Sequence, residues 1–199
     1  ASAPWLVSGN SWGTTVSATT RLIALKNNIQ YAVANLALTV KCEDGSLADK
    51  ENEGVTVKSE GFPVTGVLVG GQPSNVGWNF EPTTDDACDM TVYDKVEGVN
   101  AKAGSAEGKN YTLLLPNKGV AAEKAKVNFA VELENNTGVE FAGQDGVVPV
   151  DGKFYLVGQL DPTSKTVNGV ENPSVFMSDY QTTANVTIKT LANAYNVIP

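Results

Sequence analysis

The sequence predicts an all-β protein, an antiparallel β-sandwich with Greek-key connections. Short segments rich in Val, Ile, Thr and aromatic residues alternate apolar and polar positions, as half-buried strands do. Turn residues such as Gly, Asn and Pro separate these segments, and neither a heptad pattern nor a repeat interrupts them. Eight or more such strands in a chain of 199 residues are typical of a sandwich.

The clearest alternation lies in residues 126–133, K-V-N-F-A-V-E-L. Four of its residues share one face and are expected to point into the core: Val127, Phe129, Val131 and Leu133. Residues 153–160 predict a similar strand with Phe154 and Leu156 inward. Further strands are expected at residues 55–58, 64–69, 76–80, 90–93, 111–115, 147–150 and 182–189.

Residues 29–41 also predict a strand, with a change of parity at Ala34 and Asn35 that indicates a bulge or bend. Helical spacing competes in this region, and the turn C-E-D-G that follows favours the strand. Residues 98–108, rich in Gly and Ala, are expected to form a loop. In residues 191–198 the apolar positions fit both helical spacing and alternation, so the period decides nothing there.

Length and composition favour one large domain. Residues 1–20 are rich in Ser, Thr and Gly and are expected to be a linker or a detachable edge strand. Residues 21–199 are expected to form a single sandwich, because 42% of the residues are hydrophobic and no internal boundary is visible.

The charge balance excludes some classes of partner. The formal net charge is −8 and the pI is near 4.5, without any cluster of Lys and Arg. Nucleic acids and anionic membrane surfaces both need a basic face, so neither is expected as a partner. No apolar run approaches the about 20 residues of a membrane-spanning helix. The first residues do not have the pattern of a signal peptide, and the sequence alone does not distinguish an exported protein from a cytoplasmic one.

The residue types argue against an enzyme. The chain has no histidine, which removes His-based triads and imidazole metal ligands. It has no S-x-x-K motif, and nothing selects a working pair of carboxylates. The acidic loop with Asp85, Asp86 and Asp89 lacks the spacing of a calcium loop. We therefore expect no catalytic residue, no cofactor and no metal.

Two residue types leave alternatives open. Cys42 and Cys88 are either two small buried side chains or one disulfide, and the sequence does not decide between them. The tryptophans either pack in the core or form a stacking platform for glycans: Trp5, Trp12 and Trp78. The second reading predicts a glycan- or host-binding surface module that does not polymerise.

Four stretches resemble the fimbrillins, the type V pilus subunits on the surface of Gram-negative anaerobes. The last is V-F-M-S-D-Y-Q-T-T-A-N-V-T-I-K-T-L-A-N-A-Y-N-V-I-P at residues 175–199. Upstream are F-P-V-T-G-V-L-V-G-G-Q (62–72), V-G-W-N-F-E-P (76–82) and G-K-F-Y-L-V-G-Q-L-D-P (152–162), in the order of the family. The resemblance covers residues 31–199 and is closest to a carboxyl-terminal domain.

This resemblance implies a transthyretin-like sandwich, exported as a lipoprotein precursor and polymerised by strand exchange into fimbriae at the outer membrane. Other fimbrial subunits are then the partners, and host or bacterial surfaces are the ligands of adhesion. Residues 175–199 become the donor strand, whose pairing adds a strand to a neighbour's sheet edge. Six of its residues are expected to make the polymer contact: Val186, Ile188, Leu191, Tyr195, Val197 and Ile198.

The same segment could instead fold back on its own sandwich, and the sequence leaves this alternative open. In fimbrillins a protease cuts after a basic residue and releases an amino-terminal strand. The only arginine here, Arg21, is the residue at which such a cut is expected. The chain departs from the family pattern in being about one domain long and in ending at Pro199.

Overall fold

The computed structural model describes residues 33–74, 90–104, 108–116, 126–161, 166–167, 170–171 and 174–199. The chain divides into two compact units, Ala1–Tyr31 and Ala32–Pro199. The second unit contains all of the described residues. The boundary predicted after residue 20 lies outside them and stays a prediction.

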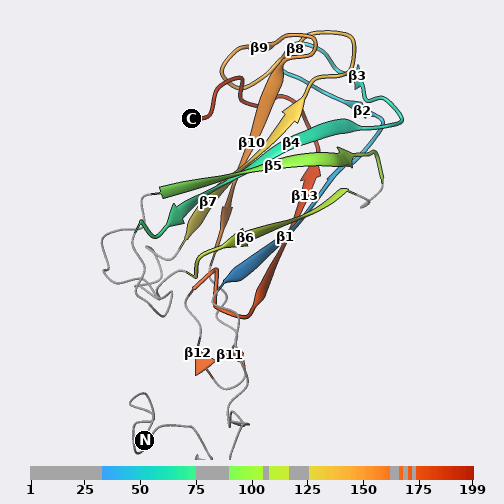
Figure 1. Ribbon diagram of the computed structural model, residues 1–199. Helices are drawn as coiled ribbons and strands as arrows, with labels where there is room; N and C mark the ends of the chain where they lie inside the picture. Colours follow the sequence, from blue (N-terminus) through green and yellow to red (C-terminus); the bar gives the residue numbers. More distant parts are fainter. Residues whose placement is uncertain are drawn as a thin grey trace, which may run out of the picture. The chain divides into compact units, whose positions relative to one another are not determined.

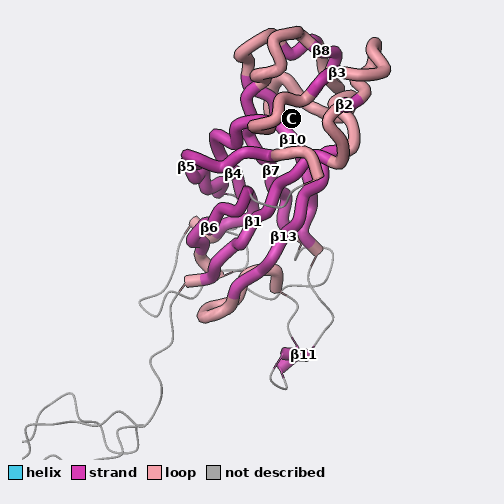
Figure 2. Tube along the Cα trace, turned by 90° about the vertical axis from the view of Figure 1, so that its right-hand side faces the viewer, coloured by secondary structure: helices cyan, strands magenta, loops and turns pink. Residues whose placement is uncertain are grey.

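Two sheets pack face to face in the second unit (Figure 1). The larger is antiparallel throughout, in the order β10-β7-β4-β5. Its strands are β4 (Phe62–Gln72), β5 (Met90–Ala101), β7 (Val127–Glu134) and β10 (Lys153–Leu160). The smaller sheet has the order β13-β1-β6 and contains β1 (Ala34–Cys42), β6 (Gly108–Leu114) and β13 (Gln181–Ile188). No helix occurs in the described residues (Figure 2), and the prediction of an all-β sandwich is confirmed.

Three short strand pairs complete the unit. One end of the sandwich carries β2 (Ser46–Leu47) with β3 (Val55–Thr56), and β8 (Phe141–Ala142) with β9 (Val147–Val148) (Figure 1). The third pair joins β11 (Thr166–Val167) to β12 (Val170–Glu171).

The smaller sheet departs from the predicted antiparallel arrangement in one pair. β1 pairs with β6 antiparallel but with β13 in parallel, from Asn35 opposite Gln181 to Cys42 opposite Ile188. β1 is therefore the central strand of its sheet. Its inward residues are all apolar, and even Ala37 and Thr39 on the outward face are buried, as expected for a strand that is flanked on both sides.

The core lies between the two sheets and is built from the alternating residues of both. Three of its phenylalanines pack together, with Phe154 of β10 edge-on to both Phe62 and Phe141 at ring-centroid distances of 5.3 Å. The inward residues predicted for residues 126–133 are all buried, as expected. The pattern therefore gave the correct face for the strand now defined as β7.

Other details of the strands differ from the predictions. The loop expected at residues 98–108 begins too early, because β5 continues to Ala101, which pairs with Phe62. Register shifts lie in β4, between Val64 and Gly66 and between Val69 and Gln72. The bend expected at Ala34 and Asn35 is not seen within β1, whose ladders run without a shift, and residues 29–32 lie outside the described part.

Candidate polymer-contact site

The six residues predicted to contact a neighbouring subunit fall into two groups in the structure. The first group belongs to the core of its own sandwich. Val186 is half-buried on the inner face of β13, and Ile188 and Leu191 are 2% and 0% exposed. These three residues follow the fold-back alternative that the sequence left open.

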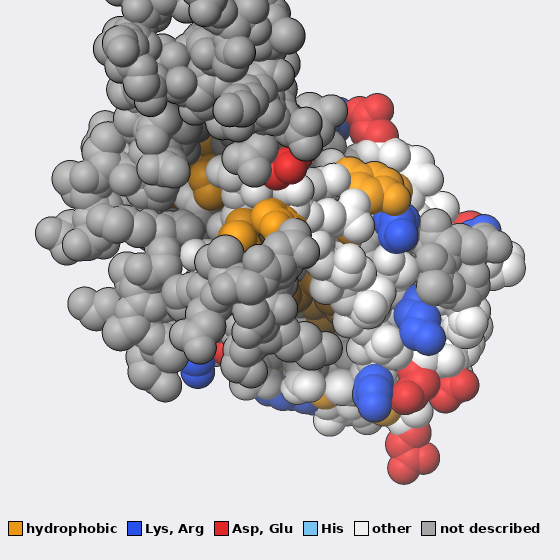
Figure 3. Space-filling model, turned by 90° about the horizontal axis from the view of Figure 1, so that it is seen from below, with side chains coloured by type: hydrophobic (Ala, Val, Ile, Leu, Met, Phe, Trp, Pro, Cys, Tyr) orange, Lys and Arg blue, Asp and Glu red, His pale blue; other side chains and the backbone are white. Residues whose placement is uncertain are grey.

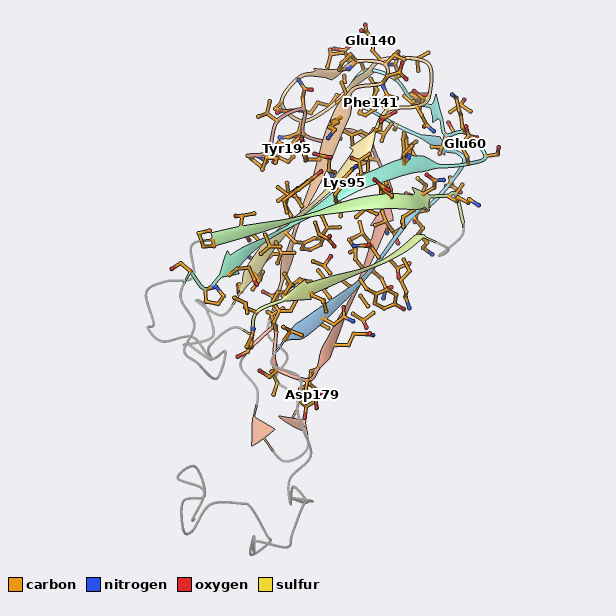
Figure 4. The ribbon with its side chains drawn as sticks, in the orientation of Figure 1. Glu60, Lys95, Glu140, Phe141, Asp179 and Tyr195 are labelled. Carbon is orange, nitrogen blue, oxygen red and sulfur yellow. The ribbon has the colours of Figure 1, made fainter. Side chains whose placement is uncertain are left out.

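The second group follows the buried residues in sequence and lies at the four-stranded sheet. The backbone of Tyr195 pairs with that of Tyr155 on the edge strand β10, donating to its carbonyl at 2.9 Å and accepting from its N–H at 2.8 Å. Val197 and Ile198 are 66% and 44% exposed. Figure 4 shows Tyr195 beside the end of the sandwich that carries Phe141. The chain has thus crossed from the edge of one sheet to the edge of the other.

Ile198 and Pro199 line a cleft of about 340 Å³ on the outer face of the four-stranded sheet. All four strands contribute to the cleft, with small or apolar side chains at its centre. The remaining lining residues are Leu68, Gly70, Thr91, Asn128, Phe129, Ala130 and Val157. An apolar side chain entering from the sheet edge is therefore the kind of group that this cleft accommodates.

A buried carboxylate lies on the same outer face of the sheet. Glu132 of β7 is 4% exposed and accepts hydrogen bonds from four side chains on the three other strands. These are Thr65 Oγ1 at 2.7 Å, Tyr93 OH at 3.2 Å, Lys153 Nζ at 2.7 Å and Tyr155 OH at 3.0 Å. The ring of Tyr93 reaches Glu132 across Gly66, where a Cβ would lie 2.5 Å from the ring.

Burial by itself raises the pKa of Glu132, but the hydrogen bonds from Lys153, Thr65 and Tyr155 outweigh it and bring the pKa below its ordinary value. An ionised carboxylate with its oxygens already bonded is poorly suited to act as a general acid near neutral pH. We interpret the cluster as a structural hydrogen-bond network that links the four strands on their outer face.

Several other predicted features lie outside the described residues. These are Arg21, Cys88, the loop with Asp85, Asp86 and Asp89, and the tryptophans Trp5, Trp12 and Trp78. The Cys42 thiol is free and buried, and it donates a hydrogen bond to the Ala101 carbonyl at 3.2 Å. Burial raises its pKa to about 12, so this thiol is unreactive near neutral pH. Because Cys88 lies outside the described residues, the disulfide that the sequence left open stays a prediction.

The described residues were also compared with the requirements of a metal site and of a membrane-spanning helix. Within the described ranges, no three His, Cys, Asp or Glu side chains are grouped so as to hold a metal ion. On the face shown in Figure 3, lysines lie among Asp and Glu side chains, with exposed hydrophobic side chains between uncharged ones. No helix in the described part of the chain is long and apolar enough to cross a membrane.

The sequence did not indicate two residues of this site: Asp145, whose carboxylate accepts the N–H groups of Asn196 and Val197, and Tyr155, whose backbone pairs with that of Tyr195. The signal for Asp145 is the turn G-Q-D-G at residues 143–146, which predicts a loop but not what the carboxylate binds. The alternation in residues 153–160 predicts a strand but not the pairing of Tyr155, because no local pattern indicates which backbone pairs with an edge strand. Compared with protein-family models, curated proteins and solved structures, the chain has no match.

Proposed function

We propose that this protein is a structural subunit of a cell-surface fimbria, without catalytic activity, and that it polymerises through residues of its carboxyl-terminal stretch. The proposal includes export to the outer membrane as a lipoprotein precursor, other fimbrial subunits as partners and a role in adhesion. Its support is the fimbrillin resemblance of four stretches in order, together with an all-β sandwich of the kind that the resemblance implies.

The observation that carries the proposal is the position of Tyr195, Val197 and Ile198. Tyr195 adds to the edge of β10 through backbone hydrogen bonds alone, which is the chemistry of strand addition. Val157 and Gln159 point their backbone groups in the same direction as Tyr155, and β10 ends its sheet among the described strands. An extended segment from a neighbouring subunit therefore has an edge to pair with and an apolar cleft for its side chains.

Assembly of the purified chain tests the proposal. We expect filaments or a ladder of oligomers in negative-stain microscopy and analytical ultracentrifugation, before or after digestion with an arginine-specific protease, which has Arg21 as its one site. The double variant Val197→Asp, Ile198→Asp should stay monomeric and folded, because it places two charges where apolar side chains are needed.

The matched control is the double variant Val139→Asp, Val150→Asp, which puts the same two charges on other exposed valines, 52% and 42% accessible. This control should assemble like the unchanged chain. The proposal fails if the unchanged chain stays monomeric in both protease conditions, or if the double variant assembles as well as the control does.

A further inference from the structure

The turn between β8 and β9, residues 143–146, holds the segment that follows Leu191. We call this turn the clasp. Gly143 donates its N–H to the Gly146 carbonyl at 2.8 Å and closes the clasp, while the N–H of Gln144 donates to the Ala194 carbonyl at 2.6 Å. The Asp145 carboxylate accepts the N–H of Asn196 at 2.6 Å and that of Val197 at 3.0 Å. Two successive clasp residues, Gln144 and Asp145, therefore hydrogen-bond the backbone of residues 194–197.

The clasp is shaped for a close backbone approach. A Cβ on Gly143 would lie 2.4 Å from the Ala194 carbonyl oxygen, so only glycine admits the segment at this distance. The clasp is also held by a contact from the loop between β2 and β3, because Lys50 Nζ donates a hydrogen bond to the Gln144 carbonyl at 2.9 Å. The bond from the Asn196 N–H is the main reason that the pKa of Asp145 lies below its ordinary value, and the carboxylate stays charged near neutral pH.

The clasp binds the backbone of the segment rather than its side chains. Every hydrogen bond between clasp or β10 and residues 194–197 ends on a main-chain N–H or C=O of the segment. Side-chain preference then comes from the next two residues, because Ile198 and Pro199 line the cleft. The residues that line the cleft indicate the chemistry that fits there, which is a branched apolar residue followed by a proline.

Burial divides the carboxyl-terminal stretch into a fixed part and a releasable part. Ile188, Leu191 and Ala194 are at most 2% exposed, so removing β13 from its sheet would uncover the core. Beyond Ala194 the segment is held by backbone bonds at the surface, and its apolar residues Val197 and Ile198 are already exposed. Residues 195–199 can leave while the sandwich stays intact.

We propose that residues 195–199 exchange between two copies of the chain. In the single subunit, the clasp with Asp145 holds these residues on their own sandwich. When they leave, the clasp, the β10 edge and the cleft bind residues 195–199 of the second copy. This inference rests on the proposed function, since it assumes that copies of the chain assemble. It places the exchange after Ala194 and leaves β13 in its own subunit.

Amide hydrogen exchange tests the clasp without requiring assembly. In Asp145→Ala, exchange at the Asn196 and Val197 amides should become about fivefold faster or more, because both donors lose a charged acceptor. In the control Glu140→Ala, which removes an exposed carboxylate of the preceding segment, these two amides should exchange as in the unchanged chain. Equal exchange in both variants would overturn the clasp.

Cross-linking tests the second copy in a background where Cys42 and Cys88 are replaced by alanine and circular dichroism confirms folding. The donor copy carries Ile198→Cys with Asp145→Ala, so its segment is released. The acceptor copy carries Val157→Cys, with residues 195–199 replaced by glycine and serine, so its clasp is vacant. Both cysteines line the cleft, and mild oxidation of the mixture should give a disulfide between the copies.

The acceptor clasp provides the matched control. Adding Asp145→Ala to the acceptor as well should lower the yield of the mixed disulfide several-fold, because the incoming segment loses its holder. Faster exchange without any mixed disulfide would overturn the second copy while leaving the clasp in place. A mixed disulfide in a chain that forms no filaments would support the inference and count against the fimbrial proposal.

Discussion

Phe154 connects the centre of the sandwich to the strand pairs at its end. Its ring contacts Phe62 from β4 on one side and Phe141 from β8 on the other, and it is fully buried. Its strand alternates so clearly that the sequence predicts its inward direction. Both partner rings belong to other strands, and Phe62 is far away in sequence, so neither contact could be predicted from the alternation within one strand.

Phe154→Ala should lower the free energy of unfolding by about 3–5 kcal/mol, because it removes both edge-on ring contacts and leaves a cavity. Val157→Ala on the outer face of the same strand, where the side chain is 46% exposed, should change it by about 0.5 kcal/mol or less. Urea unfolding followed by circular dichroism measures both values. Similar losses for the two variants would contradict the assignment of the inner face.

The burial of Glu132 is a feature that the alternation of apolar and polar residues does not predict. It occupies an outward position of β7, and an outward carboxylate is normally expected in solvent. It is buried because Thr65, Tyr93, Lys153 and Tyr155 come from three other strands to bond it. Such a cluster depends on the order and register of four strands, which the alternation within one strand does not contain.

The parallel pairing of β1 and β13 is the main feature of the strands that the sequence did not predict. Strands were predicted in both regions, but Val186 and Ile188, which were expected to contact a neighbouring subunit, face the core of their own sandwich. Alternation has the same period for both directions of pairing, so it cannot distinguish them. The direction follows from the path of the connecting chain, which carries β13 into the sheet beside β1.

Ile188→Asn should destabilise the sandwich by about 3–5 kcal/mol, because it buries an amide beside β1 without a partner. Thr187→Asn, one residue earlier on the outer face, should have an effect of about 0.5 kcal/mol. Thermal unfolding by calorimetry separates the two. If Ile188→Asn were as stable as Thr187→Asn, β13 would not belong to this core.

Two buried carboxylates connect parts of the molecule that are distant in sequence. Glu132 joins four strands, and Asp49 joins the loop between β2 and β3 to β8. Asp49 accepts the N–H groups of Glu51 at 2.8 Å and of Ala142 at 2.9 Å, with further bonds from the backbone and side chain of Asn52. Burial raises the pKa of Asp49, but these bonds outweigh it and lower the pKa from 3.8 to about 2.

The whole molecule should therefore lose stability in acid. A carboxyl group whose pKa is lowered by folding stabilises the protein above its ordinary pKa, and this contribution is lost as the pH falls through the folded value. For Asp49 that window runs from about pH 4 to about pH 2. The free energy of unfolding in urea should fall steadily across it, with Glu132 contributing in the same direction.

Asp49→Asn should flatten this dependence and lower stability at pH 7 by about 1–3 kcal/mol, since one of the two acceptor oxygens becomes an NH2 group that faces N–H donors and the charge is lost. The exposed Asp44→Asn is the matched control and should keep the slope of the unchanged chain. A slope in Asp49→Asn equal to that of the control would show that Asp49 does not carry the acid sensitivity.

The parallel pairing of β1 and β13 also has a consequence for the order in which the strands pair during folding. Asn35 and Gln181 are paired although most of the described chain lies between them, whereas β4 and β5 meet across a much shorter connection. Closing so long a loop is entropically expensive, and contacts of high sequence separation form slowly. We therefore expect one edge of β1 to remain unpaired until late in folding, when β13 completes the sheet.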